Sequence, residues 1–201
     1  MRKITLYIGS LLMLAVAGCT TAATDAVETA EPSPPGMAAF ENARRLELAG
    51  NFEKAYIAYS EVLAELEDKA MYQEAVLARA GALYQLSRYG AALAALSPMP
   101  EIPETLFDCR KMGLAAKILQ RMETPREYVE ALWEVALDTT IHEEGATLFK
   151  AGGYAELGKI YIAGDKIERA MKCFDYAAKL YEKCGDTEKM KTCLNVRDYL
   201  K

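Results

Sequence analysis

His142 opens the segment of this chain that most resembles a metal site. In a helical His-Glu-x-x-His pattern, two histidines one turn apart bind zinc and the glutamate acts as a base. Here Glu143 follows His142, but Ala146 stands where the second histidine is required, and the chain has one histidine. No sequence context supports a histidine-dependent triad either. We therefore expect no catalytic residue, no metal and no cofactor, with His142 a loop or helix-start residue.

Thiol chemistry is the second chemical possibility. Besides Cys19 the chain has four cysteines, and each lies in or beside a helical pattern: Cys109, Cys173, Cys184 and Cys193. Their spacing is not that of a zinc site. They are interpreted as small core or surface residues, and a disulfide among the last three remains an alternative.

Cys19 stands at the end of a segment with a recognisable order of charge and hydropathy. Arg2 and Lys3 precede a mostly apolar run, residues 4–17, and Gly18 comes before the cysteine. A basic head, a short apolar body and small residues at the end are typical of a secretory signal peptide. The run has 14 residues, whereas a membrane-spanning helix needs about 20.

The residues Val16-Ala17-Gly18-Cys19 resemble the lipobox of bacterial lipoproteins. That resemblance implies a signal peptide over residues 1–18, cleavage before Cys19, and acylation of Cys19 as the membrane anchor. Some lipoproteins retained at the inner membrane have aspartate after this cysteine, whereas here Thr20 follows it. We therefore expect an envelope protein on the outer membrane, facing the periplasm. An ordinary signal peptide or an N-terminal anchor is the alternative.

Charge and composition restrict what the mature chain can bind. Removing residues 1–18 takes away two cations and changes the formal net charge from −5 to −7. An acidic chain lacks the clustered Lys and Arg that phosphate contacts need, so we expect no nucleic-acid partner. Residues 19–36 are acidic, contain no aromatic residue and end in a proline-rich stretch, so they are predicted to be a disordered, lipid-anchored tether.

Beyond residue 37 the sequence repeats one helical pattern four times. An apolar or aromatic residue recurs at intervals of 37, 39 and 39 residues: Phe52, Tyr89, Tyr128 and Ile167. Alanine follows three residues later in each case (Ala55, Ala92, Ala131 and Ala170), and an apolar residue seven residues later (Tyr59, Leu96, Val135 and Phe174). Positions i, i+3 and i+7 lie on one side of a helix, and the small alanine lets a neighbouring helix approach closely.

A second periodic helix precedes each of these. Its small residue is predicted at Ala43, Ala80 and Gly158, whereas Leu119 occupies that place in the third unit. Cap signals are predicted before the second helices, including a capping box at Thr124–Glu127 and an acidic cap at Asp165. The unit is therefore interpreted as a helix hairpin, repeated four times.

The last unit resembles a tetratricopeptide repeat (TPR) at nearly every signature position: Tyr154, Leu157, Gly158, Tyr161, Ile167, Ala170, Phe174 and Ala177. The family repeat is 34 residues long, so the longer spacing here departs from it. The resemblance implies an all-α fold, a right-handed α-solenoid of about four TPR-like helix hairpins over residues 37–184. Residues 185–201 are expected to form a C-terminal capping helix.

The resemblance also implies that the first helix of each hairpin lines an inner groove. The groove residues would be Phe40, Arg44, Leu77, Tyr84, Lys117, Gln120, Lys159 and Ile162. Lys189 and Lys191 of the tail are expected to lie away from it. Such a groove suits a helix or an extended peptide. The predicted function is a non-catalytic interaction scaffold or adaptor in a bacterial envelope complex, with an unknown protein partner in the groove; the alternative is a small-ligand-binding accessory of a transport system.

Overall fold

The computed structural model describes residues 36–201, which belong to one compact unit, Ser33–Lys201. This part of the chain is all-α, with nine helices and no strand, which confirms the all-α part of the predicted fold class. The helices are α1 Met37–Leu48, α2 Phe52–Val62, α3 Lys69–Gln85, α4 Tyr89–Ala95, α5 Leu106–Arg121, α6 Arg126–Leu137, α7 Ala146–Ala163, α8 Ile167–Lys183 and α9 Thr187–Tyr199. Among residues 36–201, no helix is both long enough and apolar enough to cross a membrane.

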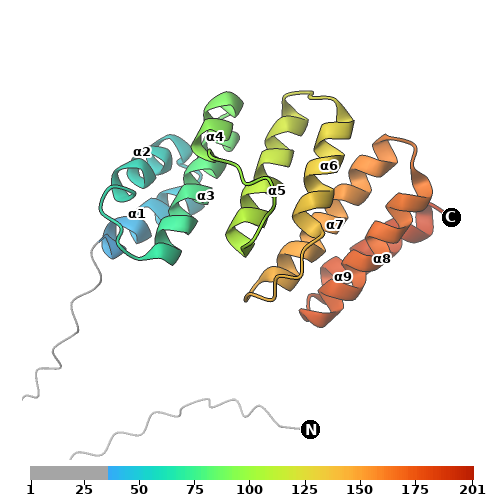
Figure 1. Cartoon of the computed structure of the whole chain (residues 1–201). Helices are drawn as coiled ribbons and strands as arrows, with labels where there is room; N and C mark the ends of the chain where they lie inside the picture. Colours follow the sequence, from blue (N-terminus) through green and yellow to red (C-terminus); the bar gives the residue numbers. More distant parts are fainter. Residues whose placement is uncertain (1–35) are drawn as a thin grey trace, which may run out of the picture. The chain divides into compact units, whose positions relative to one another are not determined.

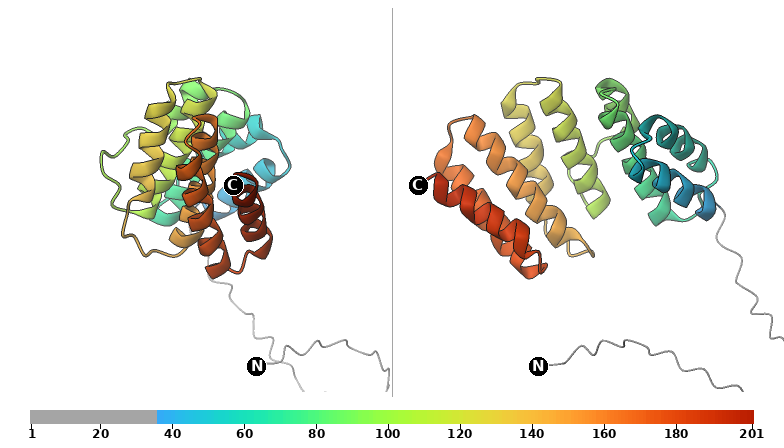
Figure 2. Two further views of the ribbon diagram at one scale, coloured as in Figure 1. Left: turned by 90° about the vertical axis from the view of Figure 1, so that its right-hand side faces the viewer. Right: turned by 180° about the vertical axis from the view of Figure 1, so that it is seen from behind.

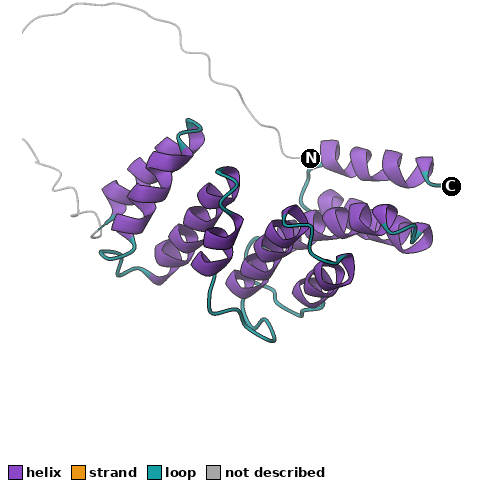
Figure 3. Ribbon diagram, turned by 90° about the horizontal axis from the view of Figure 1, so that it is seen from above, coloured by secondary structure: helices purple, strands orange, loops and turns teal. Residues whose placement is uncertain are grey.

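Each helix packs against the next one along the chain, from α1 against α2 to α8 against α9. Figure 1 shows them side by side in chain order, and Figure 2 shows the same order from behind. The view from above in Figure 3 shows that short loops connect most of the helices. The core is correspondingly divided into three clusters, which lie around α1–α3, around α3–α5, and around α5–α9.

The small residues predicted at helix contacts are buried in three of the four units. Ala43, Ala55, Ala80, Ala92 and Ala170 are fully buried. Phe52, Tyr89 and Ile167 are the first residues of α2, α4 and α8, so the predicted pattern starts where these helices start.

The predicted register of the third unit is wrong. Tyr128 is 69% exposed, Val135 is 39% exposed, and Ala131 is also exposed. Helix α6 begins at Arg126, and the residues three and seven positions later are Val129 and Trp133, each 2% exposed. The repeated pattern therefore starts two residues earlier than predicted.

The shift has a physical cause in the loop and in side-chain size. Four residues separate α5 from α6, whereas three separate the paired helices in the other hairpins. In α1, α3 and α7 the buried small residue lies five positions before the last residue of the helix. In α5 that position is Ala116, not the predicted Leu119. The other second helices have alanine at the position of Val129 in α6. In the third unit the small buried residues, such as Gly113 and Ala116, therefore lie on α5 alone at this contact.

Two predicted helix caps are also wrong. Residue Pro125 precedes α6, and Lys166 precedes α8, and neither helix has a side-chain cap. The described capping box is at α5, where Thr105 Oγ1 accepts from the Asp108 N–H at 3.2 Å. The tail is helical as predicted, and the Asp186 carboxylate caps α9 by accepting from the Lys189 N–H at 3.1 Å.

Polar links between units recur at nearly the same sequence separation. The Arg88 guanidinium donates to Glu53 at 3.1 Å across 35 residues, and Arg121 Nε donates to the Tyr84 hydroxyl at 3.1 Å across 37. Two further pairs, Arg110 with Glu74 and Lys166 with Glu130, span 36 residues each. This separation matches the length of one helix hairpin.

The predicted lipidation site Cys19, the signal peptide over residues 1–18 and the tether up to residue 35 lie outside the described residues.

Candidate functional site

Helix α7 is apolar on nearly every side. Only three of its 18 residues are charged: Lys150, Glu156 and Lys159. One side is buried in the core through residues such as Leu157 and Ile160. A helix that is apolar all round is normally covered on all sides. Here Leu148 is 49% exposed, so part of the apolar surface of α7 remains open.

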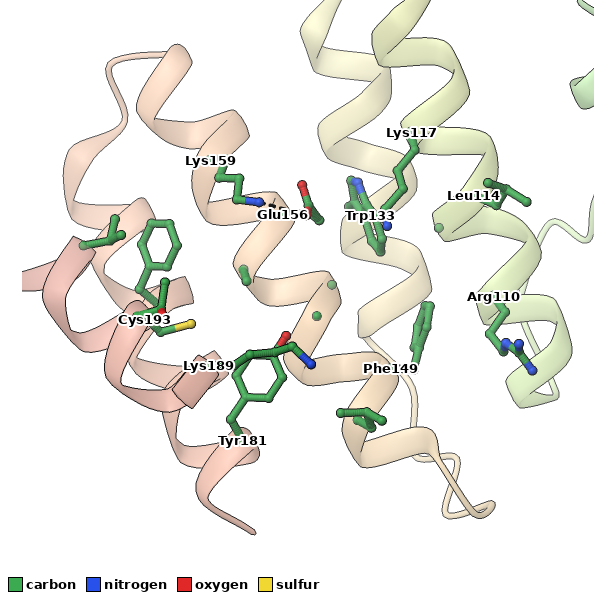
Figure 4. A pocket seen from close by; sticks show the side chains of 18 of the residues that line it. Arg110, Leu114, Lys117, Trp133, Phe149, Glu156, Lys159, Tyr181, Lys189 and Cys193 are labelled. Carbon is green, nitrogen blue, oxygen red and sulfur yellow. Dashed lines mark hydrogen bonds and ion pairs between the residues drawn. The ribbon is translucent and has the colours of Figure 1, made fainter. Parts of the chain in front are cut away.

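A pocket of about 660 Å³ opens beside this uncovered side of α7. Its walls come mainly from α5, α7 and α9, with single residues of α3 and α6 and two of α8. In Figure 4, Arg110 and Lys117 of α5 lie on one side and Lys189 and Cys193 of α9 on the other. The lining residues are Leu77, Arg110, Gly113, Leu114, Lys117, Trp133, Leu148, Phe149, Gly152, Gly153, Ala155, Glu156, Lys159, Ile162, Phe174, Tyr181, Lys189, Thr192, Cys193 and Val196. The volume is within the usual range for ligand pockets.

Three glycines in the middle of helices line this pocket, and packing explains only two of them. A Cβ on Gly113 would lie 2.9 Å from the Trp133 ring, and one on Gly153 would lie 2.6 Å from Leu137 Cδ2. Packing therefore requires both glycines. A Cβ on Gly152 would meet only the Tyr181 hydroxyl oxygen, at an ordinary 3.6 Å. Gly152 costs helix stability without being required by its neighbours.

Trp133 joins the pocket to the core. Its ring fits against Gly113 and Gly153, and its centroid lies 6.3 Å from that of Phe149. The side chain is 2% exposed, and its Nε1 has no hydrogen-bond partner among the described residues. Trp133 is therefore a core residue, as its position on a second helix favours, and its ring also forms a wall of the pocket.

Positive charge predominates in the lining of the pocket. Its charged residues are Arg110, Lys117, Lys159 and Lys189 against the single acid Glu156. Lys159 pairs with Glu156 at 2.9 Å, Lys189 pairs with Asp186 at 2.8 Å, and Arg110 pairs with Glu74. Within residues 36–201, Lys117 makes no ion pair. Three of the four cations are thus paired within the protein, and the cation that remains without a carboxylate, Lys117, favours an anionic ligand.

Four of the eight predicted groove residues line the pocket: Leu77, Lys117, Lys159 and Ile162. The other four do not. Phe40 packs against Tyr59, with ring centroids 6.0 Å apart, and Tyr84 packs against Tyr89 at 5.8 Å. Arg44 and Gln120 are exposed.

Sequence reasoning missed the contribution of α9. Lys189 was expected away from the groove, but it lines the pocket with Thr192, Cys193 and Val196. The expectation treated the tail only as a cover for the last hairpin, although a helix that packs on α8 also extends the surface beside α7. The adjacent pair Gly152-Gly153 inside an apolar helix was a usable signal, because glycine there is unfavourable unless space is needed.

The described residues contain no group of histidine, cysteine or acidic side chains arranged to hold a metal ion. His142 is exposed in the loop before α7. Cys109, Cys173, Cys184 and Cys193 are free thiols, so the alternative of a disulfide among the last three is not observed. Burial raises the pKa of Cys173 to about 11, which keeps that thiol protonated at neutral pH.

No known protein-family profile matches this sequence, and no curated protein matches it. Among solved structures, the chain is similar to the crystal structure of BtubC (BKLC) from P. vanneervenii, with a TM-score of 0.55 and 17% sequence identity. The match covers 82% of this chain and 87% of that one. At this identity the likeness concerns the fold alone.

Proposed function

We propose that this protein is a membrane-tethered, TPR-like lipoprotein that acts as a non-catalytic scaffold or adaptor in a bacterial envelope complex. Its helix hairpins form a right-handed α-solenoid closed by α9. Support for the repeat architecture comes from the buried small residues Ala43, Ala80, Ala116 and Gly158, one in the first helix of each hairpin. Further support comes from four polar links, each of which joins residues 35–37 positions apart in the sequence.

The observation on which the scaffold proposal rests is the uncovered apolar side of α7. Contiguous exposed apolar surface with a polar rim marks interaction sites in soluble proteins. Here Leu148 is exposed and Phe149 and Ile162 are half-buried, and cations of α5, α7 and α9 line the same pocket. A partner that buries these residues would complete the packing of a helix that is apolar on nearly every side.

Photo-crosslinking in native membranes tests this proposal. A photo-reactive amino acid replaces Leu148 in the pocket, and the control position is Ile57 on α2, because the two side chains are 49% and 47% exposed. We expect a discrete protein adduct from position 148 and none of the same mass from position 57. Equal adducts from both positions, or none from position 148, would contradict a scaffold that uses this pocket.

Membrane attachment is proposed to depend on Cys19, which is the residue that a lipoprotein acylates. The variant Cys19→Ala should accumulate as an unprocessed or soluble form, because cleavage and acylation both need the thiol. Detergent-phase partitioning and mass spectrometry measure this. A variant that partitions like the wild type with unchanged mass would refute the anchor, and fractionation to the inner membrane alone would refute the outer-membrane location.

A small-ligand-binding accessory of a transport system is the second candidate function. The observation that favours it is the volume of the pocket, about 660 Å³, which suits a drug-sized molecule. A ligand-dependent rise in melting temperature with periplasmic extract freed of protein would support it. Such a rise without any adduct from position 148 would replace the scaffold proposal.

A further inference from the structure

The uncovered side of α7 is long enough to hold a regular element. Its lining residues run from Leu148 to Ile162 and recur about one turn apart, through Gly152, Ala155 and Lys159. At 1.5 Å per residue this stripe extends about 21 Å, or about four helical turns. The walls from α5 and α9 flank it on both sides (Figure 4).

The polar groups of the pocket suit a helix better than an extended segment. No asparagine, glutamine or serine side chain lines it, and Thr192 contributes the only aliphatic hydroxyl group. An extended peptide needs acceptors for its backbone N–H groups, and the lining side chains offer only the Glu156 carboxylate and the hydroxyl groups of Thr192 and Tyr181, so most of these groups would be left without partners at a cost in free energy. A helix satisfies these groups within itself. The occupant that fits the apolar floor is therefore already helical when bound.

The charges around the pocket specify the flanks of that helix. Of the four cations that line the pocket, Lys117 is the one that makes no ion pair with a described residue, whereas Lys159 and Lys189 each pair with a carboxylate within one turn of the chain. Exposed pairs of this kind contribute little stability, so they can exchange partners at small cost. Carboxylates beside the apolar stripe of a bound helix would therefore find cations from both α5 and α9.

Gly152 supplies an independent observation that points to close contact with a ligand. It lies in the middle of α7, lines the pocket, and has no neighbour that a Cβ would approach closer than 3.6 Å. Glycine in the middle of a helix is less stable than alanine. Its absent Cβ leaves the floor open where the stripe passes between α5 and α9.

We propose that this pocket binds an acidic amphipathic helix of about four turns from a partner protein. The helix lays its apolar stripe along Leu148, Gly152 and Ile162 and directs carboxylates to Lys117, Lys159 and Lys189. This inference rests on the proposed scaffold function and specifies the chemistry of the partner segment.

The test uses a display library of random peptides about 16 residues long, selected on the purified full chain. We expect enrichment of sequences with apolar residues at helical spacing and Asp or Glu on the flanks. Circular dichroism of an enriched peptide should gain helical signal on binding. Enrichment of neutral or basic sequences, enrichment of peptides that stay extended when bound, or no enrichment would overturn the proposal.

Three variants locate the binding site. Gly152→Leu fills the floor and should weaken the enriched peptide by about tenfold or more, whereas Gly90→Leu on α4, also a helical glycine with open space, should not. The double variant Lys117→Glu with Lys159→Glu changes exposed residues, and should weaken binding in a salt-dependent way. Melting curves of all variants separate binding loss from folding loss. Unchanged affinity in both pocket variants would overturn the proposal.

Two other possible occupants of the pocket, a second copy of this chain and an anionic amphiphile, would each give a distinct result. Concentration-dependent dimerisation in sedimentation, abolished by Gly152→Leu, would assign the pocket to a second copy of this chain. Displacement of the peptide by dodecanoate at equal concentration would assign it to anionic amphiphiles. Either result overturns the partner helix. A protein adduct from position 148 together with one of these results would retain the scaffold and reject the helix.

Discussion

Helices α1–α4 and helices α5–α9 achieve close packing in different ways. In the first region the residues at the contact between the paired helices are fully buried alanines: Ala43 with Ala55, and Ala80 with Ala92. The second region also buries alanines, such as Ala116 and Ala170, but there glycine lies against large rings as well, with Gly113 against Trp133 and Gly158 against Phe174. The core of the second region is mainly one large cluster, whereas the two other clusters, around α1–α3 and around α3–α5, are smaller.

The pocket lies where glycine packs against a large ring, because Gly113 and Trp133 both line it. The pocket beside α7 occurs in the region with glycine and aromatic pairs, and Trp133 contributes to both the core and the pocket wall.

The largest expected effect comes from Trp133. Replacing a buried aromatic residue by alanine costs about 3–5 kcal/mol, so Trp133→Ala should lower the free energy of unfolding by that amount. Urea denaturation followed by circular dichroism measures it. Val135→Ala is the control on the same helix, since Val135 is 39% exposed. A loss below about 1 kcal/mol would mean that Trp133 is not central to the second region.

The register of α6 predicts a contrast between two alanines. Ala170→Leu inserts atoms at a fully buried helix contact, which costs about 1–3 kcal/mol or more. Ala131→Leu changes an exposed position and should stay within about 0.5 kcal/mol of the wild type. Thermal melting compares the two. Equal destabilisation by the two substitutions would show that Ala131 is buried, as the register predicted from the sequence requires.

Replacing each of the two adjacent glycines in α7 by alanine should change the free energy of unfolding in opposite directions. Gly153→Ala places a Cβ 2.6 Å from Leu137 Cδ2 and is expected to destabilise by about 1–3 kcal/mol. Gly152→Ala gains helix propensity without a clash and should stabilise by up to about 1 kcal/mol. Urea midpoints of the two variants decide. If Gly152→Ala also destabilises, packing requires that glycine and it ceases to be evidence for a ligand.

The smallest expected effect concerns the rate at which the cysteines are alkylated and involves no change in stability. The region of α1–α4 contains no cysteine, so alkylation reports only on the second region. Exposed Cys184 should react first at pH 8, whereas Cys173 is buried with a pKa raised to about 11. A raised pKa leaves less thiolate, and reactivity therefore grows as pH increases. Peptide mass mapping after brief alkylation checks the order, and faster labelling of Cys173 would show that α5–α9 opens readily.

The sequence predicted the helices because their apolar spacing is regular and because alanine at the contact repeats. It did not predict the register of the third unit. The loop before α6 has one extra residue, and α6 has Val129 at the buried position where the other second helices have alanine. For the site, the inner-face rule found Lys117 and Lys159. It did not find Lys189 or Trp133, because their positions depend on how α9 and α6 pack, which no local spacing encodes.

The uncovered side of α7 also bears on how such a complex would be isolated. Extraction of a lipid-anchored protein requires detergent, and detergents supply flexible alkyl chains at concentrations far above that of any partner. An open apolar stripe with a cationic rim attracts anionic detergents in particular. Purification in detergent would therefore displace the proposed partner from the pocket, and stabilisation in detergent-free lipid particles, or covalent capture before solubilisation, is the condition under which that partner would be retained.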